Sequence, residues 1–110
     1  MDRLYQNIKK YAQNNQIRWR QHALSRMLER DITRDEIRSI IEHGEIIEHY
    51  PESEPYPGCL ILGYATAKPL HAVITIDTEN EFVYIVTAYI PDDLHFQSDL
   101  KTRKRGNNGQ

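Results

Sequence analysis

Four segments rich in Val, Ile, Leu and Tyr follow one another through the second half of the chain. They are Glu45–Tyr50, Cys59–Ala65, Leu70–Asp77 and Glu81–Ile90, and only a few residues separate the last three. Parallel neighbours in a sheet need crossover connections of about a dozen residues or more, which such short turns cannot contain. The spacing therefore predicts an antiparallel meander of about four strands, around which the rest of the chain has to pack.

Apolar residues recur at helical spacing in the part of the chain that precedes the strands. The predicted helices run from Asp2 to about Asn15, from His22 to Arg30, and from Thr33 to His43. In the third helix Thr33 is a suitable N-cap, Glu36 completes a capping box, and Gly44 follows the last turn. The stretch Ile17–Arg20 is either a short strand or an extended link. We therefore expect an α+β domain in which N-terminal helices pack on a curved antiparallel sheet.

Charge is unevenly distributed along the 110 residues, although the formal net charge is only −2. Residues 1–38 carry nine Lys and Arg against five Asp and Glu, whereas residues 39–100 carry Lys68 against eleven acidic residues. Residues 101–110 add four more cations. This segregation predicts one face that attracts polyanions and another that suits a basic partner, unless it is a chance arrangement. We place a single domain at residues 1–100 and a disordered basic tail at 101–110.

The sequence excludes several classes of protein. No stretch approaches the roughly 18 apolar residues of a membrane helix, and the first residues, Met1-Asp2-Arg3, lack the pattern of charged and then apolar residues that is typical of a signal peptide. The single Cys59 cannot form an internal disulfide, which fits a reducing compartment, and we expect it to be a small buried side chain. The five histidines show no zinc-ligand spacing, and no glycine-rich phosphate loop is present. We therefore expect a cytoplasmic protein that needs neither metal nor cofactor and does not associate with a membrane.

A row of charged and titratable residues marks the second predicted helix. His22, Arg26 and Arg30 are four residues apart, so they lie along one side of the helix, away from Met27. Guanidinium groups bind phosphate oxygens through several donors, and an imidazole exchanges protons near neutral pH. The row is therefore suited to phosphate chemistry. The alternative is a solvated helix face that carries no function.

A second group of candidate residues lies on the predicted strands. Alternation places His71, Val73 and Thr75 on one face of their strand and Leu70, Ala72, Ile74 and Ile76 on the other. In the last strand it places Val83, Ile85, Thr87 and Tyr89 together. His71 and Tyr89 approach each other if the two strands pair in the right register, which the sequence does not reveal. The alternative is that each is an ordinary half-buried strand residue.

The segment His22–Ile32 reads HALSRMLERDI. It resembles the H-A-x-x-R-M-x-x-R-G/D-I opening of the bacterial domains grouped as domain of unknown function 4258. The resemblance continues through Ile37–Glu48, Pro69–His71 and Thr87–Pro91, and it covers roughly residues 17–93. It implies the barnase/RelE-like fold of small ribonucleases, a group that includes toxins of toxin–antitoxin pairs. Many of those toxins are strongly basic, and in this respect the chain departs from them.

The resemblance implies a metal-independent endoribonuclease acting on single-stranded or ribosome-bound RNA. In such a reaction the 2′-hydroxyl attacks the neighbouring phosphate and a cyclic phosphate forms, with an acid, a base and cations supplied by the protein. We expect His22 and His71 to exchange the protons. We expect Arg26 to stabilise the transition state and Tyr89 to orient a group or donate a proton. The RNA-binding candidates are Arg18, Trp19, Arg20 and Arg30. An antitoxin is the expected protein partner.

Two other functions fit the same sequence. The acidic block of residues 39–100 could dock a basic partner in a module without catalysis, and reversing the charges of Glu45 and Glu48 would then abolish binding. Alternatively, the domain binds RNA or DNA without turnover, which predicts retention that weakens with salt. The sequence leaves open the oligomeric state, the RNA sequence that is cleaved and the identity of an antitoxin.

Overall fold

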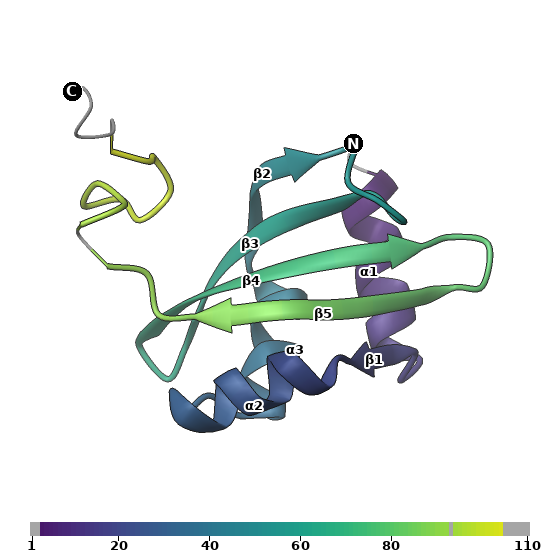
Figure 1. Cartoon of the computed structure of the whole chain (residues 1–110), viewed down its shortest axis with the longest axis horizontal. Coiled ribbons are helices and arrows are strands. Elements are labelled where there is room, and N and C mark those ends of the chain that lie inside the picture. The colour runs from purple at the N-terminus through teal and green to yellow at the C-terminus, as the bar shows by residue number, and fades with distance from the viewer. Residues whose placement is uncertain (1–2, 93, 105–110) are drawn as a thin grey trace.

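The computed structural model describes residues 3–92 and 94–104. The helices are α1 (Arg3–Gln13), α2 (Gln21–Glu29) and α3 (Arg34–His43). The strands are β1 (Ile17–Trp19), β2 (Glu45–Tyr50), β3 (Gly58–Ala65), β4 (Lys68–Asp77) and β5 (Phe82–Tyr89). The strands form one mixed sheet in the order β1-β5-β4-β3-β2 (Figure 1). The prediction of an α+β architecture is thereby confirmed.

Strands β2 to β5 form the predicted antiparallel meander, but the sheet has a fifth strand. β1, one of the two options left open for the stretch Ile17–Arg20, pairs in parallel with β5 and places Trp19 opposite Ile85. The prediction of about four strands in a purely antiparallel sheet is therefore wrong. A three-residue strand has too little periodicity to be recognised in the sequence. Its pairing partner, β5, lies more than sixty residues later in the chain.

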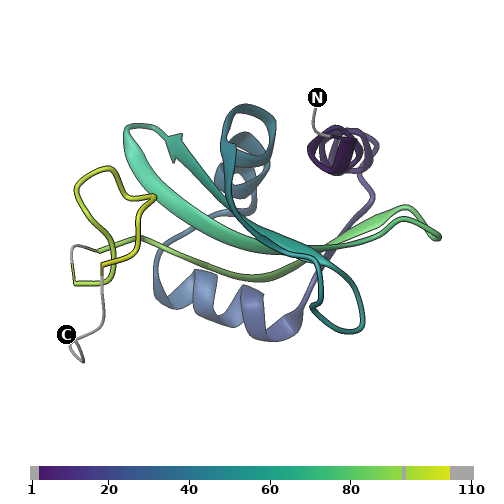
Figure 2. The same cartoon turned by 90° about the horizontal axis from the view of Figure 1, so that it is seen from above.

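Helices α1 and α3 cover one face of the sheet, whereas α2 runs along the edge of β5 and projects toward the opposite side (Figures 1 and 2). The covered face carries the core, in which the buried residues of β4 are Leu70, Ala72, Ile74 and Ile76. Ile37, Ile40 and Ile41 of α3 are buried against it, as the helical spacing predicts. Burial of each such isoleucine or leucine contributes about 1.5–3 kcal/mol. The face of the sheet opposite α1 and α3 is called the outer face below.

Both ends of α3 are determined by residues that the sequence identifies. The Thr33 hydroxyl accepts from the Glu36 N–H at 3.0 Å and the Glu36 carboxylate accepts from the Thr33 N–H at 2.9 Å, which confirms the capping box. Gly44 ends the helix, but with φ −88° its backbone is extended and not left-handed. The reason for glycine here is space, because a Cβ would collide with the carbonyl oxygens of Ile40 and Leu62.

A β-bulge in β5 changes the faces predicted for that strand. The pairing with β4 shifts so that Val86 is an extra residue between Ile85 and Thr87. An extra residue reverses the alternation of side chains beyond it. Ile85 is therefore buried in the core, whereas Tyr89 lies on the outer face opposite His71. The prediction that Tyr89 shares a face with Ile85 is wrong, because alternation read from sequence assumes a regular strand.

Residues 94–104, called the C-terminal segment below, pack on the outer face at the end of β5 (Figures 1 and 2). An isolated bridge between Phe96 and Arg103 closes this segment into a loop. Residues 101–104 belong to the predicted disordered tail, and two of their cations form ion pairs with glutamates of β2. The rest of that predicted tail, residues 105–110, lies outside the described residues.

Gly63→Ala tests how closely β3 approaches α3. A Cβ at Gly63 would lie 2.5 Å from the Cβ and 2.9 Å from the Cα of Ile40, so the strand or the helix has to move. We expect the free energy of unfolding to fall by about 1–3 kcal/mol, the range typical of an overpacked core. Tyr64→Phe is the control, since this neighbouring side chain is exposed. Urea unfolding compares the two variants, and equal stabilities would contradict the close approach.

Candidate functional site

A groove opens on the outer face between α2 and the loop of residues 51–57. Figure 2 shows that α2 and this loop project to the same side of the sheet, away from α1 and α3. The cavity between them has a volume of about 380 Å³, and Val73 and Val86 form its apolar floor. The residues that line it are Arg20, His22, Tyr50, Ser53, Glu54, Pro55, Val73, Thr75 and Val86. A cavity with an apolar floor and a few polar groups is typical of a ligand site.

His22 and Arg26 are in contact on the exposed side of α2, one turn apart. Nε of Arg26 lies 3.5 Å from Nε2 of His22, and its Nη1 lies 3.8 Å from a carboxylate oxygen of Glu29. Since a guanidinium only donates, Nε2 of His22 is the acceptor in this contact. Both side chains are exposed to solvent, and His22 lines the groove. This part of the predicted row therefore places a base beside a cation.

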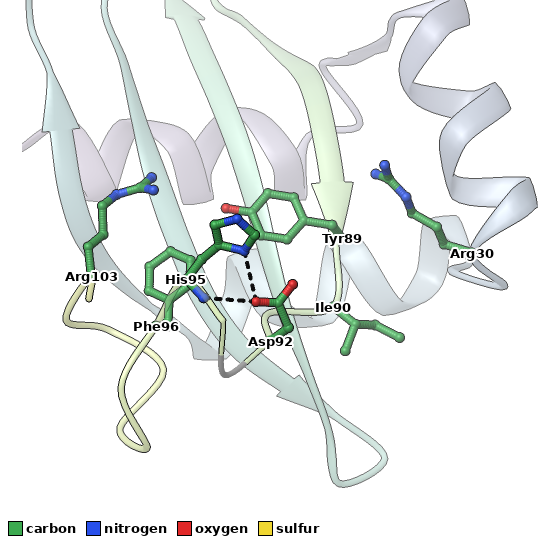
Figure 3. A pocket seen from close by; sticks show the side chains of 7 residues that line it. All are labelled: Arg30, Tyr89, Ile90, Asp92, His95, Phe96 and Arg103. Atoms are coloured by element: carbon green, nitrogen blue, oxygen red, sulfur yellow. Dashed lines mark hydrogen bonds and ion pairs between the residues drawn. The ribbon is translucent and has the colours of Figure 1, made fainter. Parts of the chain in front are cut away.

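Arg30 points away from this pair. Its Nη1 donates to the carbonyl oxygen of Ala88 at 2.8 Å, on a part of the β5 edge that β1 does not reach. An unpaired strand edge leaves carbonyl groups without partners, and the guanidinium satisfies one of them. Arg30 borders a second cavity of about 590 Å³, whose other lining residues are Tyr89, Ile90, Asp92, His95, Phe96 and Arg103 (Figure 3).

The second cavity lies where β5 continues into the C-terminal segment. Oδ1 of Asp92 accepts a hydrogen bond from the His95 N–H at 3.0 Å and lies 2.9 Å from Nδ1 of the same residue (Figure 3). The interaction with His95 lowers the pKa of Asp92. Both side chains are thus engaged in the turn that begins the segment. The groove, and not this second cavity, is the candidate site.

His71 is completely buried beneath the C-terminal segment. Its Nε2 lies 2.7 Å from the carbonyl oxygen of Leu100, and its Nδ1 lies 3.2 Å from the hydroxyl of Tyr89. A carbonyl only accepts, so Nε2 carries the proton and Tyr89 donates to Nδ1. The ring of Phe96 packs edge-on against the imidazole, with centroids 4.6 Å apart. The predicted approach of His71 and Tyr89 is confirmed, and both imidazole nitrogens are bonded within the protein.

Burial acts on the two rings in opposite directions. It lowers the pKa of His71 and raises the pKa of Tyr89, because in each case it disfavours the charged form. A neutral imidazole beside a neutral phenol is therefore the stable pair. His71 has no access to solvent while the C-terminal segment is in place.

Glu48 of β2 binds the C-terminal segment from the other side. Its carboxylate accepts from Nε and Nη2 of Arg103 at 2.7 and 3.1 Å, and from the hydroxyl of Tyr50 at 2.6 Å. The bonds from Arg103 lower the pKa of Glu48, while burial and the bond to Glu48 raise the pKa of Tyr50 to about 12. Glu45 is paired with Lys101 at 3.0 Å. The carboxylates expected to hold a basic partner are thus bound by cations of the same chain.

Two of the predicted RNA-binding arginines lie beside aromatic rings on the outer face. The guanidinium carbon of Arg18 is 4.1 Å from the centroid of the Phe82 ring, and that of Arg20 is 5.0 Å from the centroid of Tyr84. Tyr84 is stacked on Tyr56, with centroids 5.3 Å apart and an angle of 5° between the rings. Because Arg20 also lines the groove, the stacked tyrosines border the candidate site.

Trp19 lies on the other face of the sheet. It is partly buried against the core, and the guanidinium carbons of Arg34 and Arg38 are 5.9 and 5.6 Å from its ring. The aromatic surface next to the groove consists of Tyr84 and Tyr56, which sequence reasoning missed. The sequence could have identified Tyr84 as an outer-face residue, because it alternates with the buried residues Val83 and Ile85 of its strand. Tyr56 lies in a loop, where no such pattern exists.

Among residues 3–92 and 94–104, no three His, Cys, Asp or Glu side chains lie close enough together to hold a metal ion. In the same part of the chain, no helix combines the length and the apolar character that crossing a membrane requires. Cys59 is completely buried, as predicted.

Comparison with known protein families gives a match over most of the chain. A family model described as Domain of unknown function (DUF4258) matches residues 19–90. No curated protein and no solved structure matches significantly. The matched range includes α2 and strands β2 to β5, and it ends before the C-terminal segment that covers His71.

Stability should depend on pH through His71. The unfolded chain titrates near the ordinary histidine pKa of about 6.5, whereas burial lowers the pKa of His71 in the folded protein. Stability present above about pH 6.5 is therefore lost as the pH falls toward the folded pKa, because only the unfolded chain takes up the proton. Urea unfolding between about pH 7 and pH 5 should show this decline in the wild type. His71→Gln, which keeps a side-chain N–H donor, should show a shallower decline, unlike the exposed control His49→Gln. Identical slopes in all three proteins would exclude His71 as the cause.

Proposed function

This chain belongs to the DUF4258 family of domains of unknown function, and we propose that it is a metal-independent endoribonuclease that cleaves RNA held in the groove. The observation that carries the proposal is the contact between His22 and Arg26 at the exposed wall of the groove. An imidazole beside a guanidinium supplies the base and the cation that attack of a 2′-hydroxyl on a phosphodiester requires. The substrate is single-stranded RNA, free or bound to the ribosome, because only unstacked bases reach aromatic rings such as Tyr84 and Tyr56.

The proposed reaction uses the solvent-exposed side chains. Nε2 of His22 takes the proton of the 2′-hydroxyl, and the 2′-oxygen forms a bond to phosphorus. The bond from phosphorus to the 5′-oxygen of the next nucleotide breaks, which leaves a 2′,3′-cyclic phosphate. Arg26 stabilises the negative charge on the non-bridging oxygens. The leaving oxygen takes a proton from water, because His71 is buried, and His22 releases its own proton to solvent.

His71 and Tyr89 have a positioning role in this proposal. Their hydrogen bonds to each other and to Leu100 anchor the C-terminal segment at the end of the outer face. The barnase/RelE-like fold and a cytoplasmic location remain part of the proposal. An antitoxin that covers the groove is the protein partner that would restrain such an enzyme.

A second candidate is RNA binding without turnover. The burial of His71 favours this candidate. Two histidines were predicted to exchange protons, and only His22 lines the groove. Arg20 and Arg26 would then hold phosphates, and retention would weaken steeply with salt. The two candidates differ in whether the retained RNA stays intact.

Arg26→Ala should separate catalysis from folding. Because Arg26 is exposed, its loss should change the free energy of unfolding by no more than about 0.5 kcal/mol. Loss of one preorganised donor should slow cleavage by about 10²–10³-fold, and Arg26→Lys should restore only part of the rate. Initial rates on a fluorescently labelled RNA oligonucleotide in EDTA provide the measurement. Arg3→Ala removes an exposed arginine of α1 and is the matched control.

His22→Ala tests the base itself. We expect no cleavage above background, whereas mass spectrometry of the wild-type reaction should detect a 2′,3′-cyclic phosphate. Cleavage by His22→Ala at the wild-type rate would refute the mechanism. Wild-type protein that retains RNA but leaves it intact would support the binding function instead.

A further inference from the structure

The floor of the groove is closely packed where β3 passes Thr75 at Gly58. On the outer face Gly58 of β3 is the register partner of both Tyr50 of β2 and Thr75 of β4. Directly paired residues project from the same face, and a Cβ at Gly58 would lie 3.0 Å from Cγ2 of Thr75. The same Cβ would lie 2.6 Å from the carbonyl oxygen of Ile74, so glycine allows β4 to pack closely here, and both Tyr50 and Thr75 line the groove.

Among the described residues, the hydroxyl of Thr75 is buried without a hydrogen-bond partner. Thr75 is only 9% exposed, and its Oγ1 is the single buried side-chain N or O atom without a partner among the described residues. Buried hydroxyls are usually paired, because an unpaired one loses its hydrogen bonds to water without replacement. Oγ1 is itself buried, but Thr75 lines the groove, so rotation about χ1 brings the hydroxyl to a ligand that supplies the missing partner.

The surroundings of Thr75 fit a flat ring with a polar edge. Val73 and Val86 supply apolar surface in the floor, and the cation of Arg20 and the carboxylate of Glu54 line the same cavity. Tyr84, the register partner of Thr75 on β5, is stacked with a second tyrosine at the border of the groove. An aliphatic chain would leave the Thr75 hydroxyl unpaired, and a small anion would leave the apolar floor uncovered. A nucleobase satisfies both, because its faces are apolar and its edges carry donors and acceptors.

We propose that the floor of the groove at Thr75 is a nucleobase subsite, in which Thr75 rotates about χ1 to bond the edge of one base through Oγ1 while the face of the base lies on Val73 and Val86. The proposal rests on the proposed ribonuclease function, since it makes this base the neighbour of the phosphate that His22 and Arg26 engage. His22 lines the same cavity, so the base and the phosphate of one nucleotide bind together. Thr75 thereby determines which base is accepted next to the cleaved bond.

Thr75→Val tests the subsite because it removes the hydroxyl and keeps the shape of the side chain. The hydroxyl is unpaired in the free protein, so the variant should melt at the wild-type temperature or above it. Nuclear magnetic resonance titrations with the four nucleoside 3′-monophosphates should give wild-type affinities that differ among the bases. The tightest of them should weaken about tenfold in Thr75→Val, as expected for one lost hydrogen bond. Thr75→Ser should keep the wild-type order, and inorganic phosphate should bind all three proteins equally.

The outcomes distinguish the subsite from the ribonuclease itself. An unchanged order and strength of binding in Thr75→Val overturns the subsite, even if the wild type cleaves RNA. Equal wild-type affinity for the four nucleotides and for inorganic phosphate overturns it as well. If only the ribonuclease proposal fails, the wild type shows a base preference that Thr75→Val loses, yet it leaves RNA intact. His22→Ala is the matched control, since it should keep the base preference and lose cleavage.

Discussion

The extra residue Val86 in β5 is the constraint on which the outer face of the sheet depends. Before it, Ile85 is directed into the core, and beyond it the alternation is reversed, so that Tyr89 lies opposite His71. A regular strand would direct Tyr89 toward the core and leave His71 without the phenol. Val86 also lines the groove. One bulge thus contributes to the floor of the candidate site and to the anchor of the C-terminal segment, and bulges are frequent beside functional sites.

The outer face is divided into a covered part and an open part. The C-terminal segment covers the part around His71, where Arg103 is bound by the carboxylate of Glu48. The groove between α2 and the 51–57 loop forms the open part. Lys101 and Arg103 pair with Glu45 and Glu48 of β2, so part of the uneven charge along the chain is neutralised within the fold. Arg20 and Glu54 line the groove, and Arg26 lies next to it through its contact with His22, so a chain with net negative charge keeps cations on this side of the outer face.

Two histidines of similar appearance in the sequence have different chemistry in the fold. His71 is buried, both of its nitrogens are bonded, and its pKa is lowered, so it acts as a neutral packing and hydrogen-bonding group. His22 is exposed, and its lone pair faces a guanidinium. Thr75 is buried like His71, but its hydroxyl has no hydrogen-bond partner among the described residues. The environment of each side chain, and not its type, therefore determines whether its polar atoms are bonded within the fold.

Local sequence was sufficient for features that depend on neighbours in the chain. These are the capping box of Thr33, the two faces of β4, and the four-residue spacing that brings Arg26 to His22. Only the tertiary structure revealed the pairing of β1, the bulge at Val86, the position of Trp19 on the core side, and the burial of His71. Helical spacing and strand alternation follow from the geometry of a few consecutive residues. Strand register and the docking of a distant segment depend instead on contacts between residues far apart in the chain, which no local pattern specifies.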